Sequence, residues 1–152
     1  LQQLQQRQQP EQHREPGLAG ATMDDERVMA SIIPDGYHVD YAAIRIAKKA
    51  MGERLFVITD AVTDTAEGLY PHTLQGDKYE SAGILSGSAL TMLKAVQNLV
   101  AFAGISREEA LRMCSLYPAR VMGLDQQYGK IQKGYTSSLL LLDESLALIK
   151  LL

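Results

Sequence analysis

A short apolar run followed by an aspartate constrains the fold of this chain most. Residues 55–58 are Leu-Phe-Val-Ile, and Asp60 comes two positions later. The run is too short for a buried helix and too apolar for a half-exposed strand, so it predicts a strand covered on both faces, as in parallel sheets. Asp60 would then lie at the carboxyl end of that strand, where α/β folds place ligands and catalytic groups. An aspartate there can also be a turn former or helix cap, which is its commoner use.

A second strand and a helix lie upstream and complete a βαβ unit. Residues 31–36 read Ser-Ile-Ile-Pro-Asp-Gly, a short strand ended by its proline and its Asp-Gly pair. Asp40 can cap a helix over Tyr41–Met51, which has an apolar stripe on one face. A unit of this length sets its two strands parallel, with a right-handed crossover. We therefore expect His38 and Asp60 at the same edge of one sheet.

Turn and capping signals organise the rest of the chain. Acidic residues in a first turn predict a helix over Met23–Ala30, and a Gln-Gly-Asp turn predicts a hairpin over His72–Tyr79. The Gly/Ser-rich residues 83–88 are expected to open an amphipathic helix capped by Ser88. The remaining expected elements are a helix from the capping box at Ser106 to near Tyr117, a short helix over Pro118–Gly123, a turn over Gly129–Gly134 and a strand over Ser137–Leu142.

Composition excludes several classes of function. The 152 residues are 46% hydrophobic with a formal net charge of -3, an ordinary globular composition whose acidic balance argues against nucleic acid as a partner. No apolar run approaches the length of a membrane span, and nothing resembles a secretory signal. The single cysteine, Cys114, cannot form an internal disulfide, which fits a reducing, cytoplasmic compartment, and we interpret it as a small buried hydrophobe.

Both ends of the chain lack the polar residues of ordinary termini. The chain opens at Leu1 and stops at Leu152 after a run of apolar residues, so we expect further sequence on both sides. Residues 1–12 contain seven glutamines, a composition that indicates a loop or tail rather than an element of the core.

The side chains that could carry chemistry do not have the spacing of metal ligands. The three histidines stand at positions 13, 38 and 72, so the first shell of any metal would lie mostly outside this chain. We interpret His13 and His72 as solvated loop residues. His38, on the presumed functional edge, is either a locally bonded loop residue or a functional group.

Two further features have a structural and a functional interpretation. The stretch Leu85-Ser86-Gly87 before a helix is either a cap or a site for ligand oxygens built from free backbone amides. Arg14 can hold a phosphate with its planar guanidinium, although a surface arginine usually binds none.

Five motifs, in this order along the chain, point to one family. They are Arg14–Gly17, Asp35–Tyr41, Val57–Ala61, Leu85–Met92 and Tyr117–Arg120. Together they resemble the N-acetylglucosamine-6-phosphate deacetylases, a family of the amidohydrolase superfamily of metal-dependent (β/α)8 barrels. The resemblance runs from about His13 to Leu142. Each motif alone is a weak signal, but five in register are specific.

The resemblance implies a reaction. The family hydrolyses the acetamide of N-acetylglucosamine 6-phosphate, giving glucosamine 6-phosphate and acetate. A divalent metal, commonly zinc, polarises the amide carbonyl and lowers the pKa of a bound water. Asp60 aligns with the catalytic aspartate of the family, which takes a proton from that water and returns it to the departing amine.

The resemblance also implies a substrate site. His38 aligns with a substrate-binding histidine, and Arg14 aligns with an arginine that holds the sugar phosphate across the interface of a homodimer. Residues 85–87 match a loop that touches the substrate through backbone groups. The substrate-binding residues implied are Arg14, Asp35, Gly36, Tyr37, His38, Leu85, Ser86 and Gly87.

The implied fold class is α/β: the C-terminal portion of a (β/α)8 TIM-type barrel plus part of a small flanking β domain. A barrel takes about 250 residues, so this chain is expected to hold only its final quarter. The metal ligands of the family, a glutamate and two histidines, would precede Leu1. Lys133–Leu139 lacks an aspartate usual before the last strand, which bears on local structure rather than on catalysis. The expected divisions are a Gln-rich loop or tail (1–12), the barrel part (13–123) and the flanking β segment (124–152).

Three hypotheses about function remain open at this point. In the first, the parent protein is this deacetylase, and the present chain alone is inactive because it lacks the metal ligands. In the second, the parent belongs to the same superfamily but hydrolyses another amide, and Arg14 is the discriminating residue. In the third, the chain is a non-catalytic fragment that binds a phosphosugar.

Overall fold

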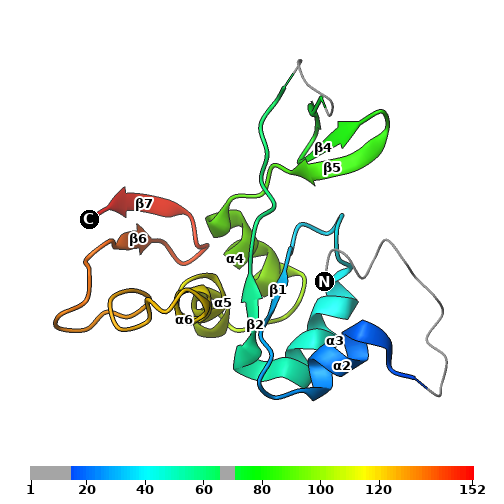
Figure 1. Cartoon of the computed structure of the whole chain (residues 1–152). Coiled ribbons are helices and arrows are strands. Elements are labelled where there is room, and N and C mark those ends of the chain that lie inside the picture. Colours follow the sequence, from blue (N-terminus) through cyan, green and yellow to red (C-terminus); the bar gives the residue numbers. More distant parts are fainter. Residues whose placement is uncertain (1–14, 66–70) are drawn as a thin grey trace.

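The computed structural model describes residues 15–65 and 71–152, so the glutamine-rich residues 1–12 and the predicted phosphate contact Arg14 lie outside the described residues. The fold is mixed α/β, as predicted. It consists of a two-stranded parallel sheet covered by helices, a three-stranded antiparallel flap and a two-stranded antiparallel hairpin near the C-terminus (Figure 1).

The parallel sheet lies at the centre of the molecule. Its strands pair from Ala30 opposite Leu55 to Ile32 opposite Val57, which confirms the predicted parallel arrangement. The outer residues of each strand are buried and the middle residue is half-buried, so both faces are covered over most of their length. The two strands are β1 (Ala30–Ile32) and β2 (Leu55–Val57).

The helix between these strands, α3 (Tyr41–Met51), has the predicted bounds. Asp40 caps it, because its Oδ1 accepts a 2.7 Å hydrogen bond from the backbone N–H of Ala42. After α3, a single 3-10 turn, η1 (Gly52–Arg54), leads into β2. The buried face of α3 consists of Ile44, Ala47 and Met51.

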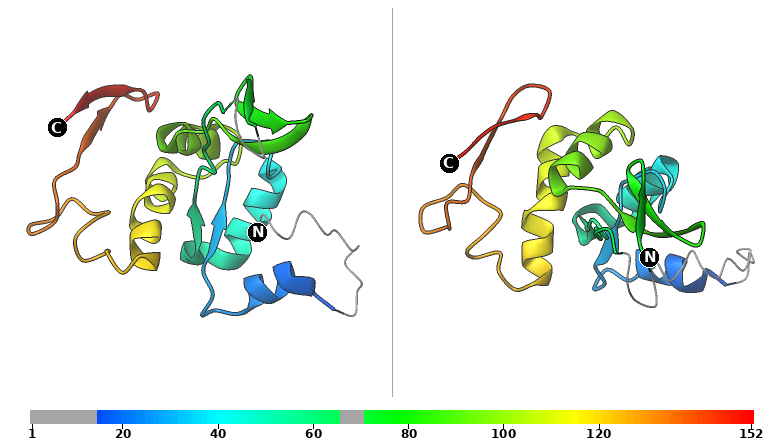
Figure 2. Two further views of the ribbon diagram at one scale, coloured as in Figure 1. Left: turned by 45° about the horizontal axis from the view of Figure 1, so that its top comes forward. Right: turned by 90° about the horizontal axis from the view of Figure 1, so that it is seen from above.

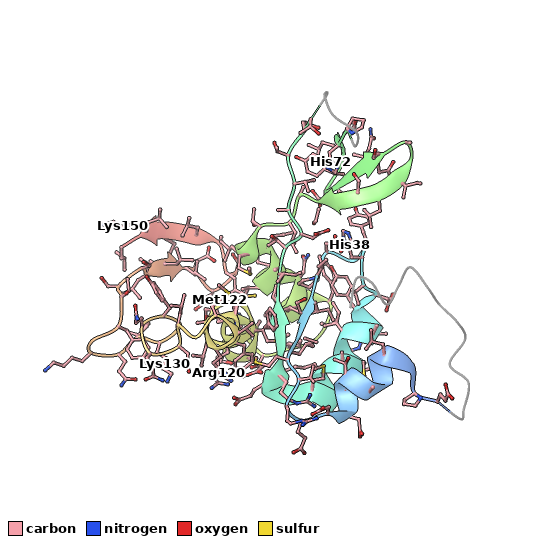
Figure 3. The ribbon with its side chains drawn as sticks, viewed as in Figure 1. His38, His72, Arg120, Met122, Lys130 and Lys150 are labelled. Carbon is pink, nitrogen blue, oxygen red and sulfur yellow. The ribbon has the colours of Figure 1, made fainter. Side chains whose placement is uncertain are left out.

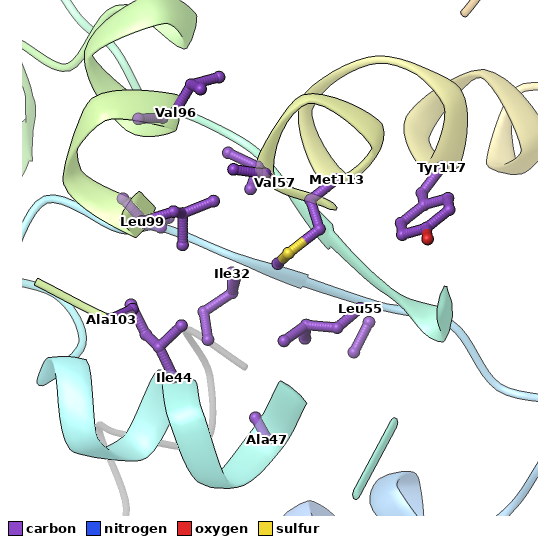
Figure 4. Packing of buried hydrophobic residues seen from close by; sticks show 14 of the residues in the cluster. Ile32, Ile44, Ala47, Leu55, Val57, Val96, Leu99, Ala103, Met113 and Tyr117 are labelled. Carbon is purple, nitrogen blue, oxygen red and sulfur yellow. The ribbon is translucent and has the colours of Figure 1, made fainter. Parts of the chain in front are cut away.

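Helices cover both sides of the strand pair (Figures 1 and 2). On one side lie α3 and α2, and on the other lie α4, α5 and α6. The core residues from the two sides gather around the strands, where Ile44, Leu99 and Met113 are all fully buried (Figure 4). The bounds of these helices are Gly17–Asp24 for α2, Met92–Ala101 for α4, Arg107–Cys114 for α5 and Leu116–Val121 for α6.

The helix predicted over Met23–Ala30 is wrong, since α2 ends at Asp24 and the chain then turns. Arg54 accounts for this end. Its guanidinium donates to the backbone oxygens of Met23 and Asp25, each at 2.8 Å, and so satisfies carbonyls that a helix end leaves without a partner. The acidic residues therefore lie at the end of a helix instead of beginning one.

The prediction for residues 83–88 is also wrong. They include a strand, β5 (Ile84–Ser88), which pairs antiparallel with β4, so this stretch offers no free amides of a helix start. Helix α4 begins at Met92, and its cap is Thr91 rather than Ser88. Ser88 is fully buried, and its hydroxyl accepts a 3.0 Å hydrogen bond from the N–H of Leu90. Strand pairing outweighs the local capping tendency here.

The remaining elements follow the predictions in outline. The hairpin predicted over His72–Tyr79 is confirmed, and together with β5 it forms the flap. The capping box at Ser106 begins α5 as expected, although α5 ends earlier than predicted and α6 begins before Pro118. Within the described part of the chain, no helix has the length and apolar character needed to cross a membrane. The remaining strands are β3 (Thr73–Gln75), β4 (Lys78–Ser81), β6 (Leu140–Leu142), inside a predicted strand, and β7 (Leu148–Leu151), which was not predicted.

Candidate functional site

Two loops meet at the carboxyl edge of the parallel sheet. The first follows β1 and carries His38, and the second follows β2 and carries Asp60. The Nε2 atom of His38 lies 3.4 Å from Oδ2 of Asp60, and Figure 3 shows His38 between the strand ends and the flap. The prediction that the two side chains share one sheet edge is therefore confirmed.

Asp35 holds the first loop together from within. Its Oδ1 accepts hydrogen bonds from the backbone N–H groups of Tyr37 (2.9 Å) and His38 (2.8 Å), and its Oδ2 accepts a 2.6 Å bond from Nδ1 of His38. The carboxylate is only 3% exposed. Asp35 therefore fixes both the backbone of the loop and the orientation of the imidazole ring.

His38 and Asp35 each stabilise the charged form of the other. The hydrogen bond to Asp35 raises the pKa of His38 above its ordinary value, against the opposing effect of burial, and the negative charges of Asp35 and Asp60 add to the rise. Burial pushes the pKa of Asp35 upward, but its hydrogen bonds to His38 and Tyr37 outweigh burial and lower it. The loop thus favours an imidazolium beside a carboxylate.

Gly36 gives this loop its shape. Its φ of +80° lies in the left-handed region, and a Cβ placed there would lie 3.1 Å from Cε2 of Tyr41. A side chain at this position would be strained and would also crowd the first residue of α3. Gly36 thus has a conformational role in this loop, and its predicted contact with a substrate stays a prediction.

Asp60 has an unusual backbone for a non-glycine residue. Its φ is +52°, a conformation that costs an L residue free energy and that aspartate and asparagine tolerate better than most. The segment is held from the end of the flap, because the N–H of Ser88 donates to the carbonyl of Asp60 at 3.0 Å and the N–H of Val62 donates to the carbonyl of Ser88 at 3.2 Å. The Asp60 side chain keeps 31% of its surface exposed.

Gly87 lets the flap approach this segment closely. A Cβ on Gly87 would lie 2.6 Å from Cγ2 of Val62, too close for any side chain unless Val62 shifts. The absence of a side chain on Gly87 is therefore what permits β5 to pack beside the residues that follow Asp60.

Leu85 and Ser86, the other two residues of the predicted substrate-binding stretch 85–87, lie in different surroundings from Gly87. Leu85 is half-buried in β5. The hydroxyl of Ser86 lies 2.8 Å from Nδ1 of His72, so His72 is a bonded residue of the flap rather than the solvated loop residue expected. Figure 3 shows His72 in the flap, above His38, which lies below the flap.

Tyr37 lies at the exposed side of the loop. Its side chain is among the exposed large apolar groups, at 51%. The ammonium of Lys78, on β4, lies 5.4 Å from the centre of the Tyr37 ring, a cation–π contact between the flap and the loop. Lys78 also pairs with Glu80 at 2.6 Å.

Asn98 is a contributor that sequence reasoning missed. It lies on α4, is 5% exposed, and donates through Nδ2 to the backbone oxygen of Pro34 at 2.9 Å. A polar residue inside the apolar stripe of an amphipathic helix was the available signal, because a buried amide requires a partner.

A metal site is not built by the described residues alone. Within residues 15–65 and 71–152, no group of three or more His, Cys, Asp or Glu side chains is placed to hold a metal ion. The expectation that the metal ligands lie elsewhere stays a prediction. Of the groups at the site, Nδ1 of His38 is already engaged by Asp35.

The site can nevertheless transfer protons and bind a polar substrate. Asp60 offers a partly exposed carboxylate, the group type used as a general base or acid. His38 offers an Nε2 that points toward the same place, with a charge state set by Asp35. Such a pair at the carboxyl ends of parallel strands defines a protein of the α/β class with its site at the strand ends.

The sequence comparisons agree with this class. The Amidohydrolase family pattern matches residues 19–150, and the chain belongs to the amidohydrolase family. It is 34% identical over 136 residues to the N-acetylglucosamine-6-phosphate deacetylase of Haemophilus influenzae, covering 83% of this chain and 35% of that protein. It is 36% identical over 142 residues to the N-acetylgalactosamine-6-phosphate deacetylase of Escherichia coli O157:H7, covering 88% of this chain and 38% of that protein.

A solved structure shows the same fold. The crystal structure of N-acetylglucosamine-6-phosphate deacetylase from Pasteurella multocida superposes with a TM-score of 0.86 at 33% identity, covering 93% of this chain and 39% of that one. The resemblance inferred from the five motifs is therefore confirmed. The chain spans little more than a third of the length of these relatives.

Proposed function

We propose that this chain provides the catalytic aspartate and part of the substrate site of a deacetylase that hydrolyses N-acetylglucosamine 6-phosphate. The observation that carries the proposal is the approach of His38 and Asp60 at the carboxyl edge of the parallel sheet, 3.4 Å apart. The similarity to deacetylases of hexosamine 6-phosphates supports the choice of substrate.

In this reaction Asp60 acts first as a base and then as an acid. It accepts a proton from the attacking water, whose oxygen bonds to the acetamide carbon. It then gives that proton to the amine nitrogen as the C–N bond breaks, which yields glucosamine 6-phosphate and acetate. An amine leaves poorly unless it is protonated, so one carboxylate serves both steps.

His38 acts as a hydrogen-bond donor to the substrate. Its Nδ1 is engaged by Asp35, which leaves Nε2 to face the site. Because its raised pKa favours the imidazolium, Nε2 carries a proton that can be donated to a substrate oxygen. Asp35 contributes through His38, whereas Tyr37 and the backbone of Leu85–Gly87 are expected to line the site.

Amidohydrolase family enzymes generally use a divalent metal, and we propose zinc for the full-length enzyme. When bound, such a metal polarises the amide carbonyl and acidifies water. The described residues do not form its ligand set, so we expect the ligands in the part of the relatives that this chain does not span.

The arrangement of the whole enzyme follows from the same proposal. Residues 13–123 would form the last strands and helices of a (β/α)8 barrel, and residues 124–152, which contain the β6–β7 hairpin, would belong to a flanking β segment. Arg14 would hold the phosphate of a substrate bound by the other subunit of a homodimer. The lone cysteine, Cys114, fits a cytoplasmic enzyme.

The test compares two versions of the protein with N-acetylglucosamine 6-phosphate and zinc: the present chain and a version extended to full barrel length. We expect deacetylation only by the extended version, and a fall of roughly 10²–10⁴-fold in kcat for Asp60→Asn, as for loss of a general acid–base group. Activity of the Asp60→Asn variant equal to the parent's would refute the role of Asp60. Phosphosugar binding without turnover by the extended version would favour a non-catalytic function.

A second candidate substrate is N-acetylgalactosamine 6-phosphate, because the relative from E. coli O157:H7 carries that name at 36% identity. The two hexosamines differ in the configuration at C4, while the acetamide and the phosphate are shared. Comparing kcat/KM for both sugars decides between them. Equal turnover of sugars without phosphate would instead indicate that the natural substrate is another amide, and it would contradict the predicted role of Arg14.

A further inference from the structure

Asn98 is a buried polar residue without a role in the proposed chemistry. It lies on the covered face of α4 between Ala95 and Leu99, both of them fully buried. Burying an amide costs free energy unless its groups are hydrogen-bonded. Its Nδ2 donates to the backbone oxygen of Pro34, which is 64 positions earlier in the chain. The amide thus ties the middle of α4 to the loop after β1.

The Pro34 carbonyl belongs to the peptide unit that begins Asp35. Because a peptide unit is planar, fixing the oxygen of Pro34 also fixes the direction of the Asp35 N–H. The Asp35 carboxylate then holds His38 through its backbone N–H at 2.8 Å and its Nδ1 at 2.6 Å. A continuous set of contacts thus leads from Asn98 to the imidazole ring.

Helix α4 is also connected to Asp60, the residue that His38 approaches. Ser88 donates its N–H to the carbonyl of Asp60 at 3.0 Å, and its hydroxyl accepts from the N–H of Leu90, just before α4 begins. The start of α4 is therefore linked to Asp60, and its middle is linked to His38. Helix α4 therefore bonds to the loop that carries His38 and is linked to the segment that carries Asp60, in addition to the strand pairing that brings the two together.

We infer that Asn98 is a positioning residue that sets the distance between the His38 imidazole and the Asp60 carboxylate. It acts through Pro34 and Asp35 and touches neither the substrate nor the reacting atoms. Its effect on rate rests on the proposed function, but its effect on His38 can be measured without any catalysis.

The test is Asn98→Asp, a nearly isosteric change that sets a carboxylate oxygen against the Pro34 carbonyl. Ring-nitrogen NMR of the full chain reports the tautomer and pKa of His38, whose neighbouring charges are Asp35 and Asp60. In Asn98→Ser, which adds no charge, we expect the pKa of His38 to fall by roughly one unit as its contacts loosen. The Nδ1–H resonance, deshielded by the short bond to Asp35, should move upfield in Asn98→Asp. Asn98→Ser, which replaces the amide with a shorter hydroxyl, should move this resonance in the same direction and keeps the test valid if Asn98→Asp does not fold.

Gln97 provides a matched control on the same helix. Its Nε2 also donates to a backbone oxygen at 2.9 Å, but this oxygen is that of Leu146, beside the C-terminal hairpin. Gln97→Glu should lower the melting temperature while leaving the His38 resonances as in the parent. An unchanged His38 in folded Asn98 variants, or an equal shift in Gln97→Glu, would overturn the inference.

Activity separates this inference from the proposed function. In the full-length enzyme, Asn98→Ser should lower kcat about 10-fold or more with little change in KM, the signature of a lost transition-state contact. Shifted His38 resonances together with no deacetylation by the parent would refute the proposed function and leave the positioning role standing. A changed KM with constant kcat and unshifted resonances would refute the positioning role.

Discussion

At the scale of single residues, Asp35 determines the properties of His38. Both oxygens of its carboxylate are used inside the loop, two bonds to backbone N–H groups and one to the imidazole. Sequence placed Asp35 among the substrate-binding residues because it stands beside His38 in a matching motif. The geometry supports an indirect contribution, in which Asp35 orients His38, the group that we propose binds the substrate.

The ion pair of His38 and Asp35 makes the free energy of unfolding depend on pH. The pKa of His38 is raised, so its contribution is fully present below its ordinary value of 6.5 and is lost as pH rises through the raised value. The pKa of Asp35 is lowered, so its contribution is present above its ordinary value of 3.8 and is lost as pH falls through the lowered value. We expect the free energy of unfolding of the parent to exceed that of Asp35→Asn most between these limits, as measured by urea unfolding across pH.

Asp143 supplies the control for that experiment. Its carboxylate also accepts backbone hydrogen bonds, from Ser145 and Ala147, and its pKa is lowered by the bond from the Ser145 hydroxyl and by these backbone bonds. Among the described residues, the bonds to this carboxylate come from Ser145 and Ala147 and not from a histidine. Asp143→Asn should therefore remove stability that is lost at acid pH, but none that is lost at alkaline pH. If the loss of free energy of unfolding in each variant changed equally with pH on the alkaline side, the Asp35–His38 contact would not be the source of that pH dependence.

The sequence predicts the place of a residue where the neighbouring residues indicate it, and not where it depends on a distant partner. Asp60 and His38 were identified because each follows a strand, and parallel strands bring their carboxyl ends together. Asn98 was missed because its partner, Pro34, is close only in the folded chain. The sequence predicts a solvated His72, because nothing local reveals the hydroxyl of Ser86 on a strand 14 positions away.

At the scale of elements, prediction succeeded where caps and periodicity agreed. Helix α3 had an aspartate cap, an apolar stripe and a terminal glycine, and its bounds came out as expected. The stretch 84–88 had a serine and glycine pattern that also fits a helix start, but it pairs with β4 as a strand. Helix α2 lies earlier in the chain than predicted. Its end is fixed by Arg54, from a distant part of the chain, which donates to the carbonyl of Met23.

The close packing of β5 against the segment after Asp60 gives a prediction for this element. Gly87→Ala should destabilise the protein by about 1–3 kcal/mol, because the new methyl group overpacks against Val62. Thermal or urea unfolding measures the change. In the extended enzyme, kcat should fall as well, since the Ser88 contacts to Asp60 shift.

Val62→Ala provides the compensating change, since it removes the two methyl groups nearest to the new Cβ. The double variant Gly87→Ala with Val62→Ala should recover part of the stability lost by Gly87→Ala alone. Additive losses in the double variant would mean that the contact with Val62 is not what restricts position 87.

At the scale of the whole molecule, a cluster of ion pairs and hydrogen bonds lies at the end of the sheet opposite the proposed site. Glu109 of α5 contacts Lys48 of α3, Arg112 at 2.8 Å and the hydroxyl of Tyr117 on α6 at 2.9 Å. Lys48 also donates to the carbonyl of Gly52, just before β2 begins. This cluster therefore joins helices from both sides of the strand pair at the amino end of β2, whereas Asp60 follows its carboxyl end.

Removing the charge at the centre of this cluster should affect stability but not the site. Glu109→Gln should lower the free energy of unfolding by about 1–3 kcal/mol, as expected when hydrogen bonds to a charged group are lost. Burial raises the pKa of Glu109, but bonds from Lys48, Arg112 and Tyr117 outweigh burial and lower it. Its contribution is therefore lost as pH falls through that lowered value.

The neighbouring Glu108 is exposed on the same helix and serves as the control. Glu108→Gln should change the free energy of unfolding much less than Glu109→Gln, and neither variant should move the pKa of His38. A His38 shift in Glu109→Gln would show that the two ends of the sheet are coupled.

The left-handed backbone at Asp60 limits which residues this position can accept. A φ of +52° suits glycine, asparagine and aspartate, and it costs other residues roughly 1–2 kcal/mol. The proposed chemistry needs a carboxylate, which leaves aspartate and glutamate. Aspartate alone meets both requirements. In a library of all substitutions at this position, we therefore expect asparagine and glycine among the folded but inactive variants, and glutamate to be impaired twice, by its backbone preference and by its longer side chain.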